Sequence, residues 1–160
     1  MREIKLLLIF GLLFSGGCEN PNNSKGMISD SSTGLMWQDN HESKTIRRDW
    51  HAAMRFCEKL TLGGYSDWSL PTHVQLFDVL SEDKPEKTKH NIFKNIALDD
   101  GYWSSSTHNK SSSFAWATHF GDGYAVGHNK GYGQYIRCNR HYMNIEALNN
   151  NHFWVKLPGN

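Results

Sequence analysis

The chain has 160 residues, a formal net charge of +1 and 12% aromatic residues. A charge this close to zero argues against a general nucleic-acid-binding protein and against one that binds membrane surfaces through its charge. The length that remains after an N-terminal leader fits one domain of ordinary size, with a crosslink to help stabilise its core.

The first 17 residues have the features of a bacterial lipoprotein signal peptide. A short charged start precedes the apolar run Leu6–Phe14, which is shorter than the roughly 20 residues that a membrane-spanning helix needs. Cys18 then follows small residues, as in a lipobox, although Ser15 stands where Leu is usual. We predict a palmitate-bearing lipid anchor at Cys18, and the alternative is an ordinary cleaved signal peptide. By analogy with lipoprotein sorting, Glu19 favours the outer membrane of the cell envelope over the inner one.

Export decides how the other two cysteines, Cys57 and Cys138, are interpreted. An even pair in an oxidising compartment predicts one disulfide. Such a bridge would close a loop of about 80 residues and add on the order of 4 kcal/mol to the free energy of unfolding. A buried free pair and a redox site are the alternatives, but redox cysteines usually lie close together, as in Cys-x-x-Cys.

The mature chain begins with a polar tether over residues 18–26, and one domain follows over residues 27–140. Met27–Asp30 and Leu35–Gln38 are predicted as two short strands. The intervening Ser-Ser-Thr-Gly would form the turn, with Gly34 supplying a positive φ.

Two helices are predicted next. Four residues of the first, Arg48–Leu60, fall on one helical face: Trp50, Ala53, Cys57 and Leu60. Asp49 is its expected N-cap. Thr72 is the expected N-cap of the second helix, which runs from His73 to about Ser81. The apolar set of that helix consists of Val74, Leu76, Phe77 and Leu80.

Short aromatic and β-branched segments predict four further strands, at Tyr102–Thr107, Phe114–Phe120, Tyr124–His128 and Tyr132–Cys138. They are expected to form an antiparallel meander after the two helices, which makes the fold class α+β. Cys138, on the last of these strands, would join the sheet to the first helix. Residues 141–160 form an Asn-rich C-terminal tail.

Six blocks of residues follow one another in order along the domain: Asp30-x-x-Thr33-Gly34-Leu35-Met36-Trp37-Gln38; Trp50, Ala53, Cys57 and Leu60; Gly64–Thr72; Tyr102–Ser105; Ala115, Trp116, Phe120 and Gly123; Ile136–Arg140. Together these blocks resemble the Lcl C-terminal domain family, named for the Legionella collagen-like protein. Ser69 and Gln75 depart from the resemblance, because Arg and Glu are usual there. Their replacement suggests that a salt bridge near Pro71 is absent.

The resemblance implies an extracellular bacterial domain with a C-type-lectin-like core, distantly similar to the formylglycine-generating enzymes. Some members resemble adhesins that bind sulfated glycans. One form assembles as a trimer, so a homo-oligomer is among the expectations. Many members have no assigned activity, and the resemblance therefore implies a fold more strongly than a function.

Two sets of residues are candidates for ligand contact. A basic loop presents Lys84, Lys87, Lys89 and Lys94, which together with Arg47 and Arg48 could meet sulfate or carboxylate groups of a polysaccharide, although a solvated charged loop is the favoured interpretation. Three rings on Gly-rich hairpins are candidates for stacking on a sugar: Tyr124, Tyr132 and Tyr135. The five Trp residues in the motif blocks are expected to fill the core instead.

The spacing of the histidines predicts neither a metal nor a cofactor. There is no His-Glu-x-x-His and no Cys/His pair at zinc-finger spacing. His119 and His128 flank a Gly-Asp-Gly hairpin and are expected to meet across strands, as a surface pair in preference to metal ligands.

No catalytic motif is present either, since the serines after Trp103 lack a Gly-x-Ser-x-Gly elbow and no base is placed by spacing. The sequence therefore predicts a surface-anchored, non-enzymatic binding or adhesion module whose partner is a glycan or another surface protein. The alternative is a structural envelope lipoprotein without a soluble ligand. A degenerate enzyme is a more remote third hypothesis.

Overall fold

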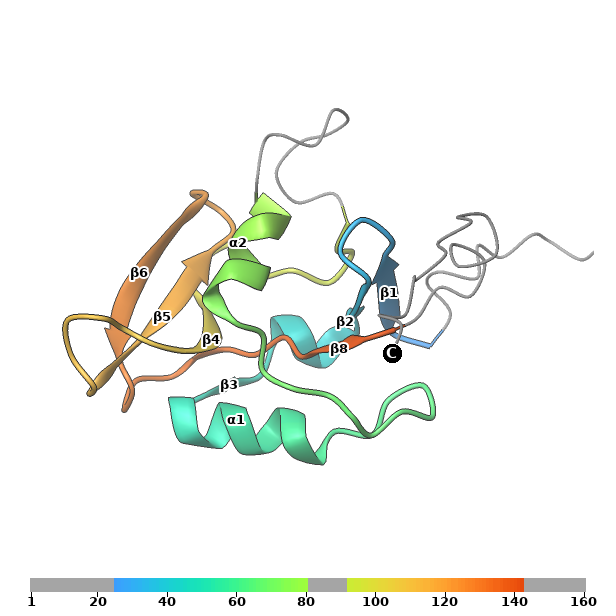
Figure 1. Ribbon diagram of the computed structural model, residues 1–160, viewed down its shortest axis with the longest axis horizontal. Coiled ribbons are helices and arrows are strands. Elements are labelled where there is room, and N and C mark those ends of the chain that lie inside the picture. Colours follow the sequence, from blue (N-terminus) through green and yellow to red (C-terminus); the bar gives the residue numbers. More distant parts are fainter. Residues whose placement is uncertain (1–24, 81–91, 143–160) are drawn as a thin grey trace, which may run out of the picture.

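The computed structural model describes residues 25–80 and 92–142, which form an α+β fold with two α-helices and two sheets (Figure 1). Within these two stretches, no helix has the length and apolar character needed to cross a membrane. The predictions for the signal peptide, Cys18, Lys84, Lys87 and Lys89 lie outside the described residues, as do residues 18–24 of the predicted tether and 143–160 of the predicted tail.

The smaller sheet is antiparallel, with strands in the order β1-β2-β8. Its strands are β1 (Met27–Asp30), β2 (Leu35–Gln38) and β8 (Asn139–His141). The first two strands and the turn between them are confirmed residue for residue. Gly34 has a φ of 68°, which an L side chain rarely adopts, and its N–H donates to the Asp30 carbonyl at 3.0 Å.

The larger sheet has five strands in the order β3-β7-β4-β5-β6. They are β3 (Arg47–Arg48), β4 (Tyr102–Thr107), β5 (Phe114–His119), β6 (Tyr124–Asn129) and β7 (Gln134–Tyr135). The antiparallel run β4-β5-β6 confirms three of the predicted strands to within one residue.

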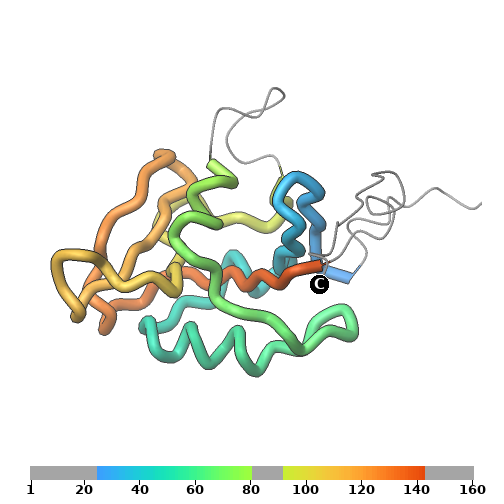
Figure 2. The backbone as a smooth tube through the Cα atoms, in the orientation of Figure 1, coloured from blue at the N-terminus to red at the C-terminus, as the bar shows by residue number. Residues whose placement is uncertain are grey.

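The predicted last strand, Tyr132–Cys138, is wrong as a single element. Its first part is β7, which lies parallel to β4, and the chain then leaves this sheet and enters the other one as β8. Figure 2 shows this segment crossing the middle of the molecule, above α1, from one sheet to the other. Cys138 therefore lies between two strands, and the expected simple meander ends at β6.

Both predicted helices are present and both are capped as expected. In α1 (Trp50–Lys59), the Asp49 carboxylate accepts from the Ala52 N–H at 2.9 Å. In α2 (His73–Leu80), the Gln75 N–H donates to the Thr72 hydroxyl at 3.2 Å, and the Thr72 N–H donates back to the Gln75 side chain at 2.8 Å. This reciprocal pair is a capping box.

The two helices differ in how well their buried faces were predicted. In α1, Ala53 and Cys57 are fully buried, as the helical spacing indicates. In α2, Leu76 and Leu80 are buried but Val74 and Phe77 are 63% and 46% exposed, so half of the predicted apolar set is wrong. Leu76 and Leu80 are one turn apart and share a face, whereas Val74 and Phe77, three residues apart, project from another side of the helix.

The core consists of two clusters. One surrounds Cys57 and Cys138, and its other buried members are Met27, Ala53, Trp68, Leu70, Trp103, Ala115, Ala117 and Ile136. The second brings the smaller sheet and α2 together through Leu35, Trp37, Leu76, Leu80, Phe93, Ala97, Tyr102, Phe120 and Tyr135. Trp37, Trp68 and Trp103 are buried as predicted, while Trp50 and Trp116 are half-buried.

Candidate functional site

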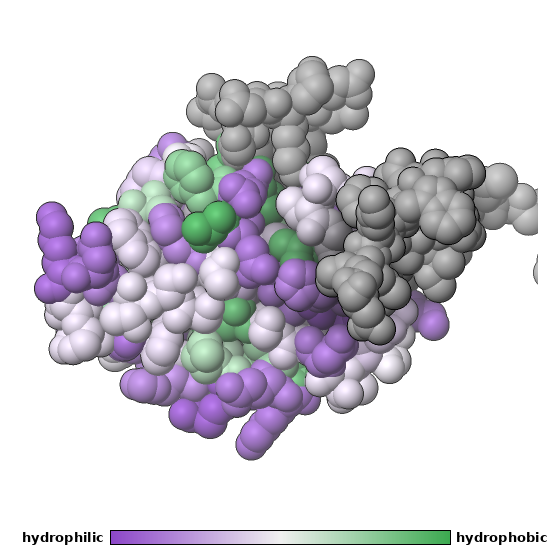
Figure 3. Space-filling model, in the orientation of Figure 1, coloured by the Kyte–Doolittle hydropathy of each residue, from purple (hydrophilic) through white to green (hydrophobic). Residues whose placement is uncertain are grey.

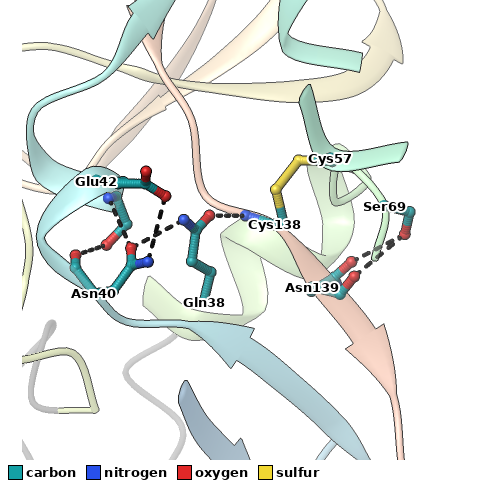
Figure 4. The surroundings of a disulfide bond; sticks show 8 residues. Gln38, Asn40, Glu42, Cys57, Ser69, Cys138 and Asn139 are labelled. Atoms are coloured by element: carbon teal, nitrogen blue, oxygen red, sulfur yellow. Dashed lines mark hydrogen bonds between the residues drawn. A yellow bond between two sulfur atoms is a disulfide. The ribbon is translucent and has the colours of Figure 1, made fainter. Parts of the chain in front are cut away.

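The predicted disulfide between Cys57 and Cys138 is confirmed, with an S–S distance of 2.06 Å and a Cα–Cα distance of 5.5 Å. Figure 4 shows it between α1 and the segment leading into β8, with Gln38 beside it. The Gln38 N–H donates to the Cys138 carbonyl at 2.9 Å, and the Cys138 N–H donates to the Gln38 side chain at 3.3 Å. Both cysteines are fully buried, which fits a structural crosslink and not an accessible redox pair.

Ser69, where the family usually has Arg, lies on the other side of this crosslink. Its N–H and carbonyl exchange hydrogen bonds with Asn139 at 2.8 and 2.9 Å, as an isolated antiparallel bridge. Figure 4 shows that the Ser69 hydroxyl also points to the Asn139 oxygens, at 3.4 and 3.5 Å. The segment before α2 is therefore attached to the start of β8 through backbone contacts, which do not depend on the missing charge.

Arg137, next to Cys138, is a fully buried cation. Its Nη1 donates to the Gln38 carbonyl at 2.6 Å and lies 3.3 Å from the Asp39 carboxylate, which is also fully buried. Its Nη2 donates to the Asn95 carbonyl, and the guanidinium lies 3.7 Å from the centre of the Phe93 ring. Burial is the largest influence on the pKa of Arg137 and lowers it, while Asp39 acts in the opposite direction. An arginine nevertheless stays protonated in a protein, so this pair is a buried ion pair.

An open concavity of about 400 Å³ lies along the outer side of α1, and we call it the α1 groove. It is lined by Glu42, Arg48, Ala52, Arg55, Phe56, Lys59, Leu60 and Thr61. Arg55 and Lys59 are one helical turn apart, so they project from the same side of α1. Figure 3 shows hydrophilic residues along the edge of the molecule where α1 lies.

The α1 groove combines cationic heads with an apolar floor. Arg48, Arg55 and Lys59 are exposed, and within residues 25–80 and 92–142 none of them forms a salt bridge with an acidic side chain. Glu42 is the one acid in the lining. The half-buried Phe56 supplies apolar surface between the charges. Such a groove is suited to an anion attached to a carbon skeleton.

A second concavity, of about 510 Å³, lies beside the smaller sheet and is lined by Met36, Tyr65, Arg140, His141 and Tyr142; we call it the Tyr65 pocket. Its arginine is already paired, because Arg140 donates to both Asp67 carboxylate oxygens at 2.6 and 2.9 Å. These hydrogen bonds are the main reason that the pKa of Asp67 is lowered. The guanidinium also lies 3.8 Å from the centre of the Tyr65 ring.

The predicted ligand-contact residues are not brought together. Lys94 is exposed, and its backbone N–H donates to Asp39 at 2.9 Å. Tyr124 and Tyr132 are 45% and 66% exposed, so their rings are accessible.

Tyr135 is a correction to the predicted contacts, because its side chain is 8% exposed. Its hydroxyl donates to Asp99 at 3.2 Å, and its ring packs against Tyr102. Burial and the Asp99 carboxylate both raise the pKa of Tyr135, burial more than the carboxylate. Its place on the central strand β7 explains the difference, since the sequence suggested a hairpin.

Sequence reasoning missed the roles of Arg55 and Lys59. A signal for them existed in the helix pattern, since both fall off the apolar face of the predicted first helix. That pattern does not distinguish a solvated helix face from a groove, because the lining of the groove also includes Glu42, which precedes the helix in the sequence.

His119 and His128 meet as predicted, with their Nε2 atoms 3.2 Å apart. Burial and the neighbouring His128 lower the pKa of His119, burial being the larger cause. Nowhere in the described part of the chain do three or more His, Cys, Asp or Glu side chains gather in a way that could hold a metal ion.

These features define a disulfide-stabilised α+β domain whose surface includes the cationic α1 groove and the Tyr65 pocket. The family model of the Lcl C-terminal domain matches residues 26–140, which is most of the chain. The chain therefore belongs to the Lcl C-terminal domain family. A comparison with curated proteins finds no match.

Proposed function

We propose that this protein is a surface-anchored, non-enzymatic binding module for anionic, sulfated glycans, and that the α1 groove is its contact site. The observation that carries the proposal is the group of three exposed cations, Arg48, Arg55 and Lys59, around one concavity without acidic partners in the described residues. Sulfate and carboxylate groups are the anions that such side chains bind through charge-assisted hydrogen bonds.

The Tyr65 pocket supports this choice by contrast. Its one arginine already gives two hydrogen bonds to Asp67, so an incoming sulfate would have to displace a carboxylate. In the α1 groove no such competition arises within the described residues. The groove is also open along the helix, which suits a polymer that passes across the surface.

A binding role is favoured over an enzymatic one by the distribution of perturbed ionisable groups. Catalytic sites concentrate groups with displaced pKa values in one cleft. In the described part of the chain the displaced groups are Asp67, His73, Tyr102, His119, Tyr135 and Arg137. None of them lines either concavity.

The wider setting belongs to the same proposal. The two helices, two sheets and buried disulfide are compatible with a C-type-lectin-like core, which the family resemblance implies. A lipid anchor at Cys18 would hold the domain at the bacterial envelope, more plausibly at the outer than at the inner membrane. In the alternative, a structural envelope lipoprotein, the same domain would have no soluble ligand.

The test is the affinity of the purified chain for heparin, measured by isothermal titration calorimetry at several salt concentrations. The double variant Arg55→Ala/Lys59→Ala should bind about tenfold more weakly, which corresponds to about 1.4 kcal/mol. It should also show a smaller dependence of the affinity on salt, because fewer ionic contacts remain.

Lys110→Ala is the matched control for Lys59→Ala, because it removes one exposed lysine outside the groove. It should leave the affinity unchanged. If instead Lys84→Ala/Lys87→Ala/Lys89→Ala weakens binding and the groove variant does not, the contact site is the basic loop. Absence of heparin binding by the unaltered chain, together with no signal on a glycan array, would favour the structural alternative.

A further inference from the structure

The imidazoles of His119 and His128 come together although the two residues do not face each other in the sheet. His119 at the end of β5 is opposite Tyr124, while His128 on β6 is opposite Ala115. Directly opposed residues of an antiparallel pair project from the same face, and so do residues two apart on one strand. All four side chains therefore share one face of the hairpin.

Small residues make room for the meeting of the two rings. Ala117 and the directly opposite Val126 are the residues of this face between the two histidines, and on β5 the side chain is only a methyl group. Gly101 lies alongside, and a Cβ added there would be 2.9 Å from His119 Nε2. The same added Cβ would be 2.9 Å from Gln134 Oε1, a buried amide oxygen that accepts from the Gly101 N–H at 3.0 Å.

Both rings are held by aromatic neighbours. The His119 ring is stacked on Tyr124, with a centroid distance of 4.6 Å and an interplanar angle of 8°. The His128 ring packs edge-on against the fully buried Trp103, at 6.3 Å and 86°. These contacts restrict the rotation of each imidazole, so the approach of the two Nε2 atoms is built into the hairpin.

The separation of the two nitrogen atoms matches a shared metal ion. Zinc–nitrogen bonds of 2.0–2.1 Å at tetrahedral angles put two ligand nitrogens about 3.3 Å apart, and the observed Nε2–Nε2 distance is 3.2 Å. A hydrogen bond between the rings requires one Nε2 to carry the proton. If both protons are on Nδ1, the two Nε2 lone pairs face each other, and a cation held by both nitrogens removes their repulsion.

We propose that His119 and His128 form a two-histidine chelate for a borderline divalent transition metal, with Zn²⁺ as the representative ion. Imidazole nitrogens favour Zn²⁺, Ni²⁺ and Cu²⁺, whereas Ca²⁺ and Mg²⁺ require oxygen ligands. Water completes the coordination of the ion. The sequence favoured a surface pair without metal, and the 3.2 Å distance is the observation that supports a chelate.

Of the two carboxylates that act on His119, the Asp100 carboxylate is already paired with Arg47, whereas Asp122 adds negative charge near the two rings. A cation held by both rings would therefore meet a favourable potential from Asp122.

The proposal is tested by titrating the purified full chain, freed of metal with EDTA, with ZnCl₂ in a calorimeter. His119→Gln and His128→Gln should each weaken this site at least tenfold, and the double variant should be no worse than either single one. His41→Gln, which removes an exposed histidine elsewhere, should bind as the unaltered chain does. CaCl₂ and MgCl₂ should give no heat of binding at this site.

A second measurement uses the unaltered chain and does not depend on the folding of variants. Substoichiometric Ni²⁺ or Cu²⁺ should broaden the NMR signals of the His119 and His128 imidazoles before those of the other histidines. The proposal is overturned if both rings stay sharp while others broaden. It is also overturned if both Gln variants, shown to be folded by circular dichroism in EDTA, bind Zn²⁺ as tightly as the unaltered chain.

Discussion

At the scale of single residues, Arg137 and Asp39 form a buried ion pair whose hydrogen bonds connect separate segments of the chain. Asp39 accepts from the Asn95 N–H at 2.8 Å and from the Lys94 N–H at 2.9 Å, besides facing Arg137. One carboxylate therefore attaches the segment after residue 91 to the end of β2. The arginine does the same from the other side, through the Asn95 carbonyl.

Removing one member of this pair should be much more harmful than removing a surface ion pair. Asp39→Ala leaves a buried guanidinium without its counter-charge, so we expect the free energy of unfolding to fall by about 3–5 kcal/mol. The matched control is Asp67→Ala, which breaks the pair with Arg140; because the Asp67 side chain is 61% exposed, the loss should be smaller, about 1 kcal/mol. Urea denaturation followed by circular dichroism measures both; equal losses in the two variants would contradict the argument.

At the scale of elements, the features that the sequence predicts well are those decided locally. The β1–β2 hairpin follows from a short turn with Gly34 at a positive φ. The N-caps Asp49 and Thr72 each depend on a residue three positions further along the chain. The β7 and β8 pairings depend instead on partners about 30 and 100 residues away, and no local pattern shows where the chain changes sheets.

The candidate site shows the same division. The pairing of Cys57 with Cys138 follows from the number of cysteines, since these two remain when Cys18 is assigned to the lipid anchor. The approach of His119 to His128 follows from the geometry of one hairpin. The α1 groove combines residues from before, within and after a helix, so its shape exists only after packing. Tyr135 was assigned to a surface hairpin because its neighbours are glycines, although its strand pairs on both sides.

The capping box of α2 gives a test at this scale. Thr72→Ala removes the hydroxyl that accepts from the Gln75 N–H, and we expect a loss of about 1 kcal/mol in the free energy of unfolding. Gln75→Ala should cost less, because it leaves the Thr72 hydroxyl in place. Thr61→Ala is the control, since Thr61 is exposed and forms no side-chain hydrogen bond within the described residues. A loss in Thr61→Ala as large as that in Thr72→Ala would speak against a capping effect.

At the scale of the whole molecule, two sheets and α1 are joined by one short stretch of chain. Residues 134–141 contribute β7 to the larger sheet and β8 to the smaller one, and they carry the disulfide to α1 between the two. The positions of the two sheets and of α1 relative to one another are therefore all constrained by this stretch. The same stretch contributes to both core clusters, through Ile136 and Cys138 to one and through Tyr135 to the other.

Loss of the disulfide should therefore affect the stability of the whole domain. Cys57→Ala/Cys138→Ala should lower the free energy of unfolding by about 2–5 kcal/mol, because the bridge closes a loop with a sequence separation of 81. Thermal denaturation with and without reductant measures it. Reductant should lower the Tm of the unaltered chain but leave that of the double variant unchanged. An unchanged Tm in a chain shown by mass spectrometry to be fully reduced would refute the expectation.

The position of Cys138 immediately before β8 has a mechanical consequence. β8 is an edge strand of three residues, so a force on the C-terminal end of the described domain would peel it from β2 with few hydrogen bonds to resist. The separation would stop at Cys138, because a covalent bond ties that residue to α1. Under tension the domain would lengthen by a few residues and then hold, with the larger sheet and the α1 groove outside the extended part of the chain.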